Sequence, residues 1–152
     1  MIPASSETQI LEKGTQIESL LLVVAAVLID SDNRILVTQR PAGKWMAGKW
    51  EFPGGKVEPR ETPEAALVRE LQEELGTAVR PDELTPYRFV SHTYPERMRH
   101  VLMPTYICRT WVGEPQGQEA QALKWVSADQ MEQIDFLEAD LPLIPLLCED
   151  FS

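Results

Sequence analysis

The stretch that decides the fold runs from Gly54 to Thr77 and reads GGKVEPRETPEAALVRELQEELGT. Thr62 fits the N-cap position of a helix, Pro63 fits its first turn, and Gly76 fits the position just after its last turn. These signals predict a helix from Pro63 to Leu75 that follows a glycine turn.

The predicted helix has two contrasting sides. One side is apolar and is formed by Val68, Leu71 and Leu75, with Leu67 at its edge. At about 100° per residue, a second side carries three carboxylates within an arc of about 100°: Glu70, Glu73 and Glu74. Like charges three and four residues apart repel, and the C-terminal end of a helix favours cations, so both effects oppose this arrangement. Since most charge runs are solvated surfaces, an exposed acidic face is the first interpretation to weigh.

A divalent cation bound among these carboxylates would relieve their repulsion. Mg²⁺ and Mn²⁺ prefer hard oxygen ligands, and they keep several waters while they bridge to phosphate groups. Gly54 and Gly55 lack side chains, so the backbone of this turn can approach a metal ion and a phosphate closely. Arg69 and Glu61 can form a charge-assisted pair that holds the loop against the helix. The residues therefore predict a site where a metal ion meets phosphate.

The spacing of this stretch resembles the Nudix box, the signature of the Nudix hydrolase family. Five residues separate Gly55 from Glu61, seven more lead to Arg69, and the run RELQEELG ends at Gly76. Every fixed position of the box is matched. The one departure is Thr77, where the family usually has an aliphatic residue, and it touches no charged position. A match of this length makes chance agreement, and with it the solvated-face interpretation, remote.

The resemblance implies a role for each residue of the box. Glu70, Glu73 and Glu74 would be ligands of Mg²⁺, or of Mn²⁺, together with the main-chain carbonyl of Gly54. Catalysis would depend most on Glu73 and Glu74. The residues that would orient these ligands are Gly55, Glu61 and Arg69.

Two flanking stretches resemble one branch of the family, the MutT-like nucleoside triphosphate pyrophosphohydrolases. They read ILVTQRPAGKWMAGKWEFPGGK and GEPQGQEAQALKWVS. By this resemblance Arg40 would contact the phosphates and Lys56 would lie near the metal and a phosphate. Glu119 would supply a further carboxylate to the metal or to the attacking water. For each of the three, an ordinary exposed side chain is the alternative.

The base of the nucleotide is less well determined. Arg99 aligns with a base-contacting arginine only if two residues are inserted in the preceding hairpin. Asp140 stands where the enzymes selective for 8-oxo-guanine have an asparagine, which can both donate and accept, whereas an ionised aspartate only accepts. An aspartate there also resembles the branch that acts on cytidine nucleotides. A third interpretation makes Asp140 the N-cap of the last helix.

Three functions therefore stay open. The first is hydrolysis of nucleoside triphosphates of the 8-oxo-dGTP type, and the second is hydrolysis of CTP or dCTP. The third is cleavage of another nucleoside diphosphate linkage, such as ADP-ribose, which the MutT-like flanks disfavour. A non-catalytic nucleotide-binding module would be expected to carry a degenerate box, and this box is intact.

Composition limits the classes of partner. The 152 residues fit one domain, and the net charge of −10 disfavours a polymeric nucleic acid held by a basic surface. The longest apolar run, from Leu20 to Ile29, is too short to span a bilayer, and no basic signal-peptide start is present. Cys108 and Cys148 are isolated, so we expect buried, reduced thiols rather than a zinc site. We expect a cytoplasmic protein, monomeric or homodimeric, that binds small nucleotides.

The order of predicted elements indicates an α/β protein. Residues 1–18 are expected to form a flexible tail, and residues 19–152 a single domain. An apolar strand buried on both faces is predicted from Ser19 to Asp30, and Arg34 to Gln39 is predicted to return beside it as a hairpin. Further strands are expected near residues 56–57, 87–93, 101–111 and 123–126, a helical turn at 128–133, and a broken helix at 140–147. The Nudix resemblance implies an α/β/α sandwich around a mixed β-sheet.

Overall fold

The computed structural model describes residues 17–152, so the predicted tail lies almost wholly outside the described residues. The strands are β1 (Ser19–Leu28), β2 (Ile35–Gln39), β3 (Trp50–Glu51), β4 (Gly54–Lys56), β5 (Leu84–Tyr94), β6 (Arg99–Cys108) and β7 (Leu123–Val126). The α-helices are α2 (Pro63–Leu75) and α3 (Leu143–Phe151). Short 3₁₀ turns occupy Pro81–Glu83, Pro95–Arg97, Ala128–Gln133 and Glu138–Asp140.

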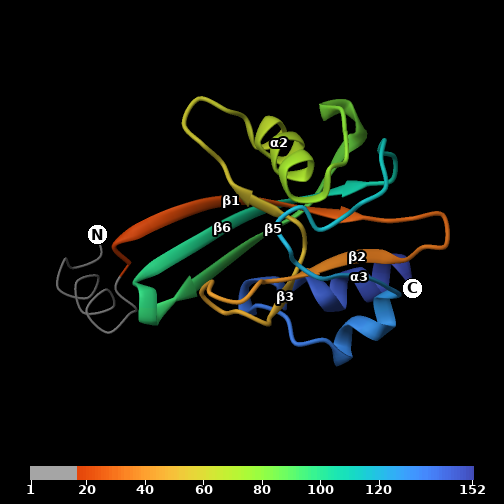
Figure 1. Ribbon diagram of the computed structural model, residues 1–152. Coiled ribbons are helices and arrows are strands. Elements are labelled where there is room, and N and C mark those ends of the chain that lie inside the picture. The colour runs from red at the N-terminus through yellow and green to blue at the C-terminus, as the bar shows by residue number, and fades with distance from the viewer. Residues whose placement is uncertain (1–16) are drawn as a thin grey trace, which may run out of the picture.

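The strands form a mixed arrangement in two sheets (Figure 1). The larger sheet has the order β4-β1-β6-β5, in which β1 and β6 are parallel and the other neighbours are antiparallel. The smaller sheet has the order β3-β2-β7 and is antiparallel. Figure 1 shows α2 on one side of the larger sheet and α3 on the opposite side. The α/β fold with a mixed sheet between helices is confirmed.

The predicted hairpin between the first two strands is wrong beyond its turn. Asn33 has the positive φ of 61° that a tight turn needs, and the chain does reverse there. Only a single bridge, Ile29 to Ile35, then joins the two strands. Both edges of β1 are taken by β4 and β6, and both edges of β2 by β3 and β7, so the strands diverge into separate sheets. This divergence opens space between them.

Alternation along the second half of β1 divides the interior into two cores. Val24, Ala26 and Leu28 pack with α2, whereas Ala25 and Val27 pack in the core that contains α3. The first half of β1 departs from the prediction of burial on both faces, because Leu20 and Leu22 belong to neither core of the described residues. As a result Leu20 is 66% exposed and Leu22 is 36% exposed.

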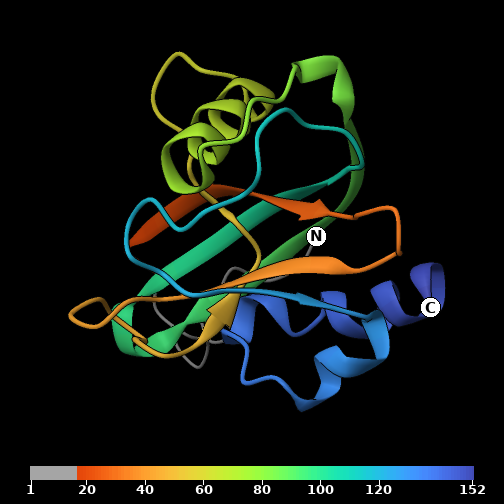
Figure 2. The ribbon, with the colours of Figure 1, turned by 45° about the vertical axis from the view of Figure 1, so that its right-hand side comes forward.

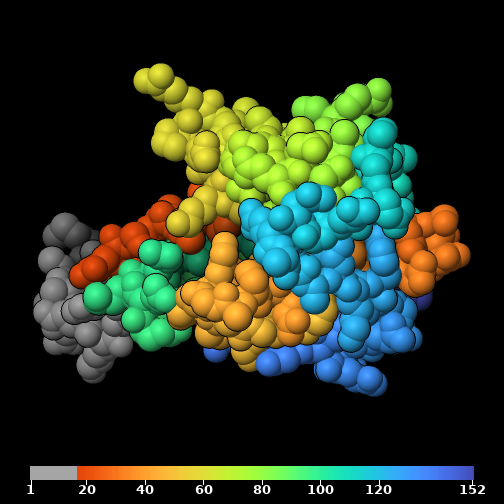
Figure 3. Space-filling model, in the orientation of Figure 1, coloured from red at the N-terminus to blue at the C-terminus, as the bar shows by residue number. Residues whose placement is uncertain are grey.

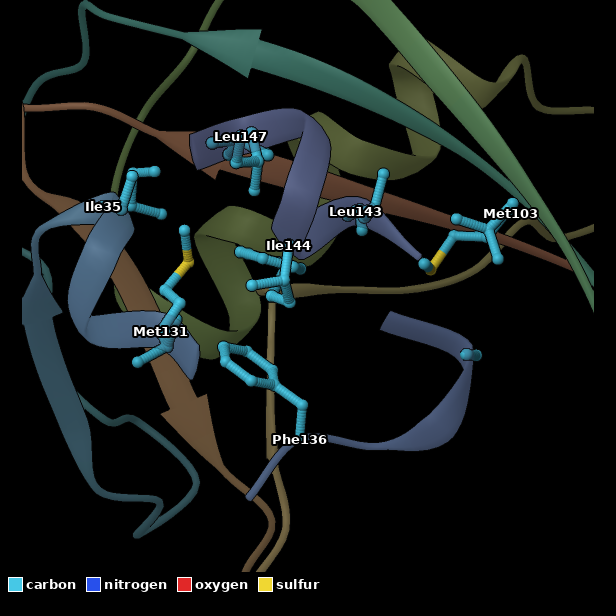
Figure 4. Close-up of a cluster of buried hydrophobic side chains, with 14 of the residues drawn as sticks. Ile35, Met103, Met131, Phe136, Leu143, Ile144 and Leu147 are labelled. Atoms are coloured by element: carbon cyan, nitrogen blue, oxygen red, sulfur yellow. The ribbon is translucent and has the colours of Figure 1, made fainter. Parts of the chain in front are cut away.

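The core on the side of α3 is built from segments far apart in sequence. Figure 4 shows side chains from β2, β6, the segment of residues 128–140 and α3 pointing toward one another, and those labelled are Ile35, Met103, Met131, Phe136, Leu143, Ile144 and Leu147. Full burial of a side chain of this size contributes about 1.5–3 kcal/mol. This core fixes the C-terminal segment against the sheets.

Helix α2 has the predicted boundaries. The Oγ1 atom of Thr62 accepts a hydrogen bond from the backbone N–H of Ala65 at 3.1 Å, and Gly76 ends the helix in the left-handed conformation at φ 69°. The apolar face is centred differently from the prediction. Leu67 is fully buried, whereas Val68 is only partly buried. The sheet therefore packs against the side of the helix that carries Leu67 and Leu71.

The C-terminal segment excludes one of the interpretations of Asp140. The last helix begins at Leu143 with Pro142 at its N-cap position, and no side chain caps it. Asp140 instead ends the 3₁₀ turn Glu138–Asp140 and is buried. The N-cap interpretation is therefore wrong.

The cysteines and the helices bear on two further expectations from composition. Both cysteines are free, Cys108 buried and Cys148 partly buried, as predicted for reduced thiols except for the partial exposure of Cys148. Between residues 17 and 152 we find no helix with the length and apolar character that crossing a membrane requires.

Candidate active site

A cavity of about 500 Å³ opens where the two sheets diverge. Its walls come from β1, the end of β2, the β3–β4 segment, α2, the β5–β6 hairpin and the loop before β7. The cavity brings together ten of the residues predicted from sequence: Arg40, Gly54, Gly55, Lys56, Glu70, Glu73, Glu74, Arg99, Glu119 and Asp140. Of the predicted residues, only Glu61 and Arg69 do not line it.

Arg69 connects the glycine turn, the following loop and the glutamates of α2. Its Nη2 donates to Glu61 Oε1 at 2.6 Å and to the backbone carbonyl of Lys56 at 3.1 Å. Its Nη1 donates to Glu70 Oε1 at 3.0 Å and to Glu73 Oε2 at 3.3 Å. The hydrogen bond from Arg69 also lowers the pKa of Glu61. The predicted ion pair is therefore present, and it orients residues of the box from outside the cavity.

The two glycines of the turn leave no room for side chains. A Cβ atom on Gly55 would lie 2.3 Å from Cδ of Glu70, and one on Gly54 would lie 1.9 Å from the backbone oxygen of Val24. Gly54 also donates its backbone N–H to Glu74 Oε2 at 3.4 Å. The turn therefore packs directly against two carboxylates of the helix, Glu70 and Glu74.

Burial and mutual repulsion raise the pKa values of two glutamates of α2, Glu70 and Glu74. Burial raises the pKa of Glu74 to about 9, and the nearby charges of Glu70 and Glu51 add to this effect. Burial also raises the pKa of Glu70, although Arg69 opposes the shift. A bound divalent cation would favour the ionised form of both groups. The donor set, which consists only of oxygen atoms, fits a hard cation such as Mg²⁺.

Glu73 differs from the expectation that three carboxylates converge. Its side chain is 53% exposed and lies against Arg69. Within residues 17–152 no three acidic, histidine or cysteine side chains are close enough together to form a ready-made metal site. The reason is local, because Arg69 draws Glu70 and Glu73 toward its own guanidinium while Glu74 faces the glycine turn.

Arg40 lies at the end of β2, where two other groups hold it. Its Nη1 pairs with Glu51 Oε2 at 3.0 Å, and its Nε donates to the backbone carbonyl of Trp45 at 2.8 Å. Sequence reasoning missed Glu51, whose pKa is raised by burial in spite of Arg40. The only signal was its place in the stretch WEFPGGK, immediately before the box.

Asp140 lies at the inner end of the cavity and is only 3% exposed. Its pKa is raised well above the ordinary value, first by burial and then by Glu51, with partial opposition from Arg40 and from the backbone N–H of Phe52. Burial therefore favours the neutral form of this carboxyl group. A neutral carboxyl can both donate and accept a hydrogen bond, as an asparagine side chain does.

Aromatic side chains that sequence reasoning missed flank this inner end. Trp45 meets Tyr94 edge to face with ring centroids 4.9 Å apart, and the guanidinium of Arg97 lies 4.7 Å from the centre of the Trp45 ring. The hydroxyl of Tyr94 accepts a hydrogen bond from the backbone N–H of Ala139 at 2.9 Å. These contacts join three segments that are far apart in sequence, and they give the inner end an apolar wall suited to a planar ring.

The remaining predicted residues lie at the rim of the cavity. Lys56 is exposed at the end of β4, Arg99 is partly buried at the start of β6, and Glu119 is exposed in the loop that precedes β7. Their positions place two cations and one carboxylate within the walls of a single cavity. Their roles in binding or catalysis stay predictions.

Comparison with known proteins agrees with the site and the fold. The NUDIX domain family matches residues 20–147. The 8-oxo-dGTP diphosphatase of Escherichia coli K12 is 38% identical over 127 residues, which are 84% of this chain and 95% of that protein. The CTP pyrophosphohydrolase of the same strain is 41% identical over 125 residues, 82% of this chain and 89% of that protein.

Solved structures show the same relationship. A MutT structure, from work on the proteins of Aliivibrio salmonicida and Vibrio cholerae, superposes with a TM-score of 0.75 at 32% identity and covers 87% of this chain and 99% of its own. The solution structure of the Escherichia coli ORF135 protein gives a TM-score of 0.69 at 39% identity, with 86% and 90% covered. The chain belongs to the Nudix family and is a Nudix hydrolase that acts on nucleotides. Enzymes of this family generally use divalent metal ions.

Proposed function

We propose that this enzyme hydrolyses (deoxy)nucleoside triphosphates to monophosphate and pyrophosphate with Mg²⁺, and that its substrate is an oxidised purine nucleotide of the 8-oxo-dGTP type. The observation that carries the proposal is one cavity with two unlike ends. Acids and glycine backbone gather at one end, and a buried carboxyl lies beside aromatic rings at the other. We further expect the enzyme to be cytoplasmic, monomeric or homodimeric, and without a polymeric nucleic-acid partner.

At the acidic end, Glu70, Glu73, Glu74 and the carbonyl of Gly54 would hold Mg²⁺, or Mn²⁺ in its place. The ion supplies an acidified water and neutralises charge on the phosphates. Glu70 and Glu73 would leave part of their contact with Arg69 when they bind it, since Arg69 keeps Glu61 as a partner at 2.6 Å. The turn would then stay anchored while the ligands rearrange.

The side chains at the rim would complete the reaction. Lys56 and Arg40 would bind the phosphate chain, and Arg40 would do so from the orientation that Trp45 and Glu51 impose. Glu119 would accept the proton of the attacking water or bind a metal-bound water, because its charge acts on both Glu70 and Glu74. Arg99 would lie near the base.

At the inner end, the neutral carboxyl of Asp140 offers one donor and one acceptor. Unmodified guanine presents two acceptors at N7 and O6. Oxidation at C8 places a hydrogen on N7, so that 8-oxo-guanine presents one donor and one acceptor. On the edge formed by N7 and O6, a neutral Asp140 complements the oxidised base and not the ordinary one. The 38% identity to the 8-oxo-dGTP diphosphatase of Escherichia coli supports the same substrate.

A second candidate is hydrolysis of CTP or dCTP. Cytosine presents its N4 amino donor next to the N3 acceptor, and this pair also complements a neutral carboxyl. The observation that favours this candidate is the aspartate itself at position 140, together with the 41% identity to the CTP pyrophosphohydrolase of Escherichia coli.

A substrate panel tests both candidates. Monophosphate and pyrophosphate release would be measured with Mg²⁺ over 8-oxo-dGTP, dGTP, CTP, dCTP and ADP-ribose. The proposal expects the highest kcat/KM for 8-oxo-dGTP and a much lower value for dGTP. A higher value for CTP or dCTP would select the second candidate. Efficient cleavage of ADP-ribose alone would overturn both.

A further inference from the structure

The loop of residues 113–121 caps the C-terminal end of α2. Figure 2 shows this loop, in cyan, running from β6 past the end of the helix toward β7, and in Figure 3 it packs directly against the helix. The backbone N–H of Gln116 donates to the carbonyl of Leu75 at 3.0 Å, and that of Gln118 donates to the carbonyl of Glu74 at 2.9 Å. Since the last turn contains no basic residue, these amides satisfy carbonyls that cations could otherwise meet.

One side chain of this loop makes hydrogen bonds in two directions. The Nε2 atom of Gln121 donates to the backbone carbonyl of Glu74 at 3.0 Å. Its Oε1 atom accepts the backbone N–H of Glu119 at 2.8 Å. A single amide group therefore connects the residue predicted to bind metal on α2 with the acidic residue predicted to act from the loop.

The backbone between Glu119 and Gln121 needs such support. Ala120 adopts a positive φ of 62°, which is unfavourable for a residue with a side chain. The turn is also tight, because a Cβ atom on Gly117 would lie 2.2 Å from the backbone oxygen of Gln121. Glu119 itself is exposed, and Gln121 is its one hydrogen-bond partner that the described part of the chain shows. Besides the backbone hydrogen bonds of its neighbours Gln118 and Ala120, the position of Glu119 thus depends on Gln121.

We propose that Gln121 is a positioning residue for hydrolysis: its amide ties the Glu119 loop to the last turn of α2 and so holds the Glu119 carboxylate at the acidic end of the cavity. This inference rests on the proposed function, in which Glu119 assists the attacking water. Gln121 lines the cavity beside Glu119, but its two hydrogen bonds are made to the protein backbone. Its effect would therefore reach the reaction through Glu119.

The chain offers a matched control in the same loop. Gln118 is exposed, and its backbone N–H, not its side chain, holds the carbonyl of Glu74. Methionine has nearly the length of glutamine but lacks both hydrogen-bonding groups. Gln121→Met and Gln118→Met therefore make the same chemical change on either side of Glu119, three residues apart.

The experiment compares kcat and KM for the best substrate of the panel. We expect Gln121→Met to lower kcat about ten- to a hundredfold, the range that misplacement of a reacting group produces. KM should stay within about twofold, because no contact with the ground-state nucleotide is removed. Gln118→Met should match the wild type. Gln121→Glu, which keeps the acceptor and loses the donor, should also lower kcat, and it serves if the methionine variant folds poorly.

A double-mutant cycle separates positioning from general stability. In a Glu119→Gln background, Gln121→Met should cost less than about twofold in kcat, since the group it positions has already been changed. An equal cost in both backgrounds, or wild-type kcat in Gln121→Met, would overturn the proposal. Hydrogen exchange adds a readout that does not need activity. The Glu119 amide should exchange faster in Gln121→Met and not in Gln118→Met.

The two readouts keep this inference distinct from the proposed function. A wild-type enzyme that hydrolyses no member of the panel would sink the proposed function, and with it the catalytic part of the inference. An unchanged rate of hydrogen exchange at the Glu119 amide in an active Gln121→Met enzyme would overturn only the role of Gln121. The proposed function would still stand.

Discussion

The two ends of the cavity are built in opposite ways. The acidic end comes from the continuous stretch of residues 54–77, in which a turn, a loop and a helix meet through Arg69. The inner end joins β3, the end of β5 and the 3₁₀ turn Glu138–Asp140, for example through the hydrogen bond from the Leu137 N–H to the carbonyl of Trp50 at 2.9 Å. Local sequence can specify the first end. The second end exists only once distant segments have packed.

This difference predicts that changes at the acidic end affect turnover, whereas changes at the inner end affect the choice of substrate and the pH dependence of stability. The largest effect is expected at Glu74, whose carboxylate is partly buried beside the glycine turn. Glu74→Gln should lower kcat by roughly 10³-fold or more, with nucleotide still bound, because a neutral amide is a poor ligand for Mg²⁺. Single-turnover kinetics and nucleotide titration would measure the two quantities separately. Near-normal turnover would remove Glu74 from catalysis.

A smaller loss of turnover is expected from a single methyl group in the turn. In Gly55→Ala the new Cβ would lie 2.3 Å from Cδ of Glu70, so that carboxylate must move. Displacement of a catalytic group by about 1 Å can cost about a hundredfold in rate. We expect a loss of that order in kcat with little change in the melting temperature. A normal kcat would show that the position of Glu70 is not critical.

At the inner end, Asp140→Asn tests how the base is recognised. An asparagine offers a donor and an acceptor at every pH, whereas Asp140 does so only while it is neutral. We expect the variant to hydrolyse 8-oxo-dGTP at least as well as the wild type at pH 7 and to retain activity at higher pH. The kcat/KM profile from pH 6 to 9 would measure this. Profiles of identical shape in the two proteins would contradict recognition by a neutral Asp140.

The same substitution changes how stability depends on pH. The folded-state pKa of Asp140 is raised above its ordinary value of 3.8, so the folded protein retains a proton that the unfolded chain releases. The contribution of Asp140 to the free energy of unfolding is therefore fully present below that ordinary value and is lost as pH rises toward the raised folded-state pKa.

Urea unfolding at several pH values from 4.5 to 8 would test this linkage. Asp140→Asn should flatten the decline of stability with rising pH. The exposed Asp129 supplies the control, since Asp129→Asn should leave the slope as in the wild type. The slope of the free energy of unfolding against pH should differ between Asp140→Asn and the wild type. Equal slopes would show that Asp140 ionises alike in the folded and unfolded states.

The smallest effect is expected where a helix cap is removed without touching the cavity. Thr62 caps α2 through a hydrogen bond of 3.1 Å to the Ala65 N–H. Thr62→Ala should lower the free energy of unfolding by about 1 kcal/mol, the usual value of such a cap. The value of kcat should hardly change, because α2 is also fixed by Leu67, Leu71 and Leu75 in the core. Denaturant unfolding and steady-state kinetics would check both statements.

Much of the fold and of the site could be predicted from the sequence because their signals are local. The caps of α2 depend on residues within one helical turn, and Arg69 pairs with Glu61 only 8 residues away, and the structure has both as predicted. The hairpin of β1 and β2 could not be judged this way, since competition from β4, β6, β3 and β7 decides which strands pair. Leu67 was placed at the edge of the apolar face because the direction of the sheet relative to the helix is not a local property.

Some residues of the site were missed by sequence analysis for the same reason. Glu51 and Trp45 carry no motif of their own, and their importance appears only when Arg40 is seen to contact both. The convergence of Glu73 with its neighbours was overestimated, since spacing along a helix gives the side of a residue and not the partner that its side chain selects.

By itself the sequence determined the helix of the box, its boundaries and the acidic and glycine residues that define a Nudix hydrolase. These features depend on interactions between residues that are close in the chain, so they can be predicted from the order of the residues alone. Only the tertiary structure decided that Asp140 is buried with a raised pKa, that Trp45 and Tyr94 form a wall, and that Gln121 connects Glu119 to α2. Burial and long-range hydrogen bonds are properties of packing, because they depend on which distant segments exclude water from one another.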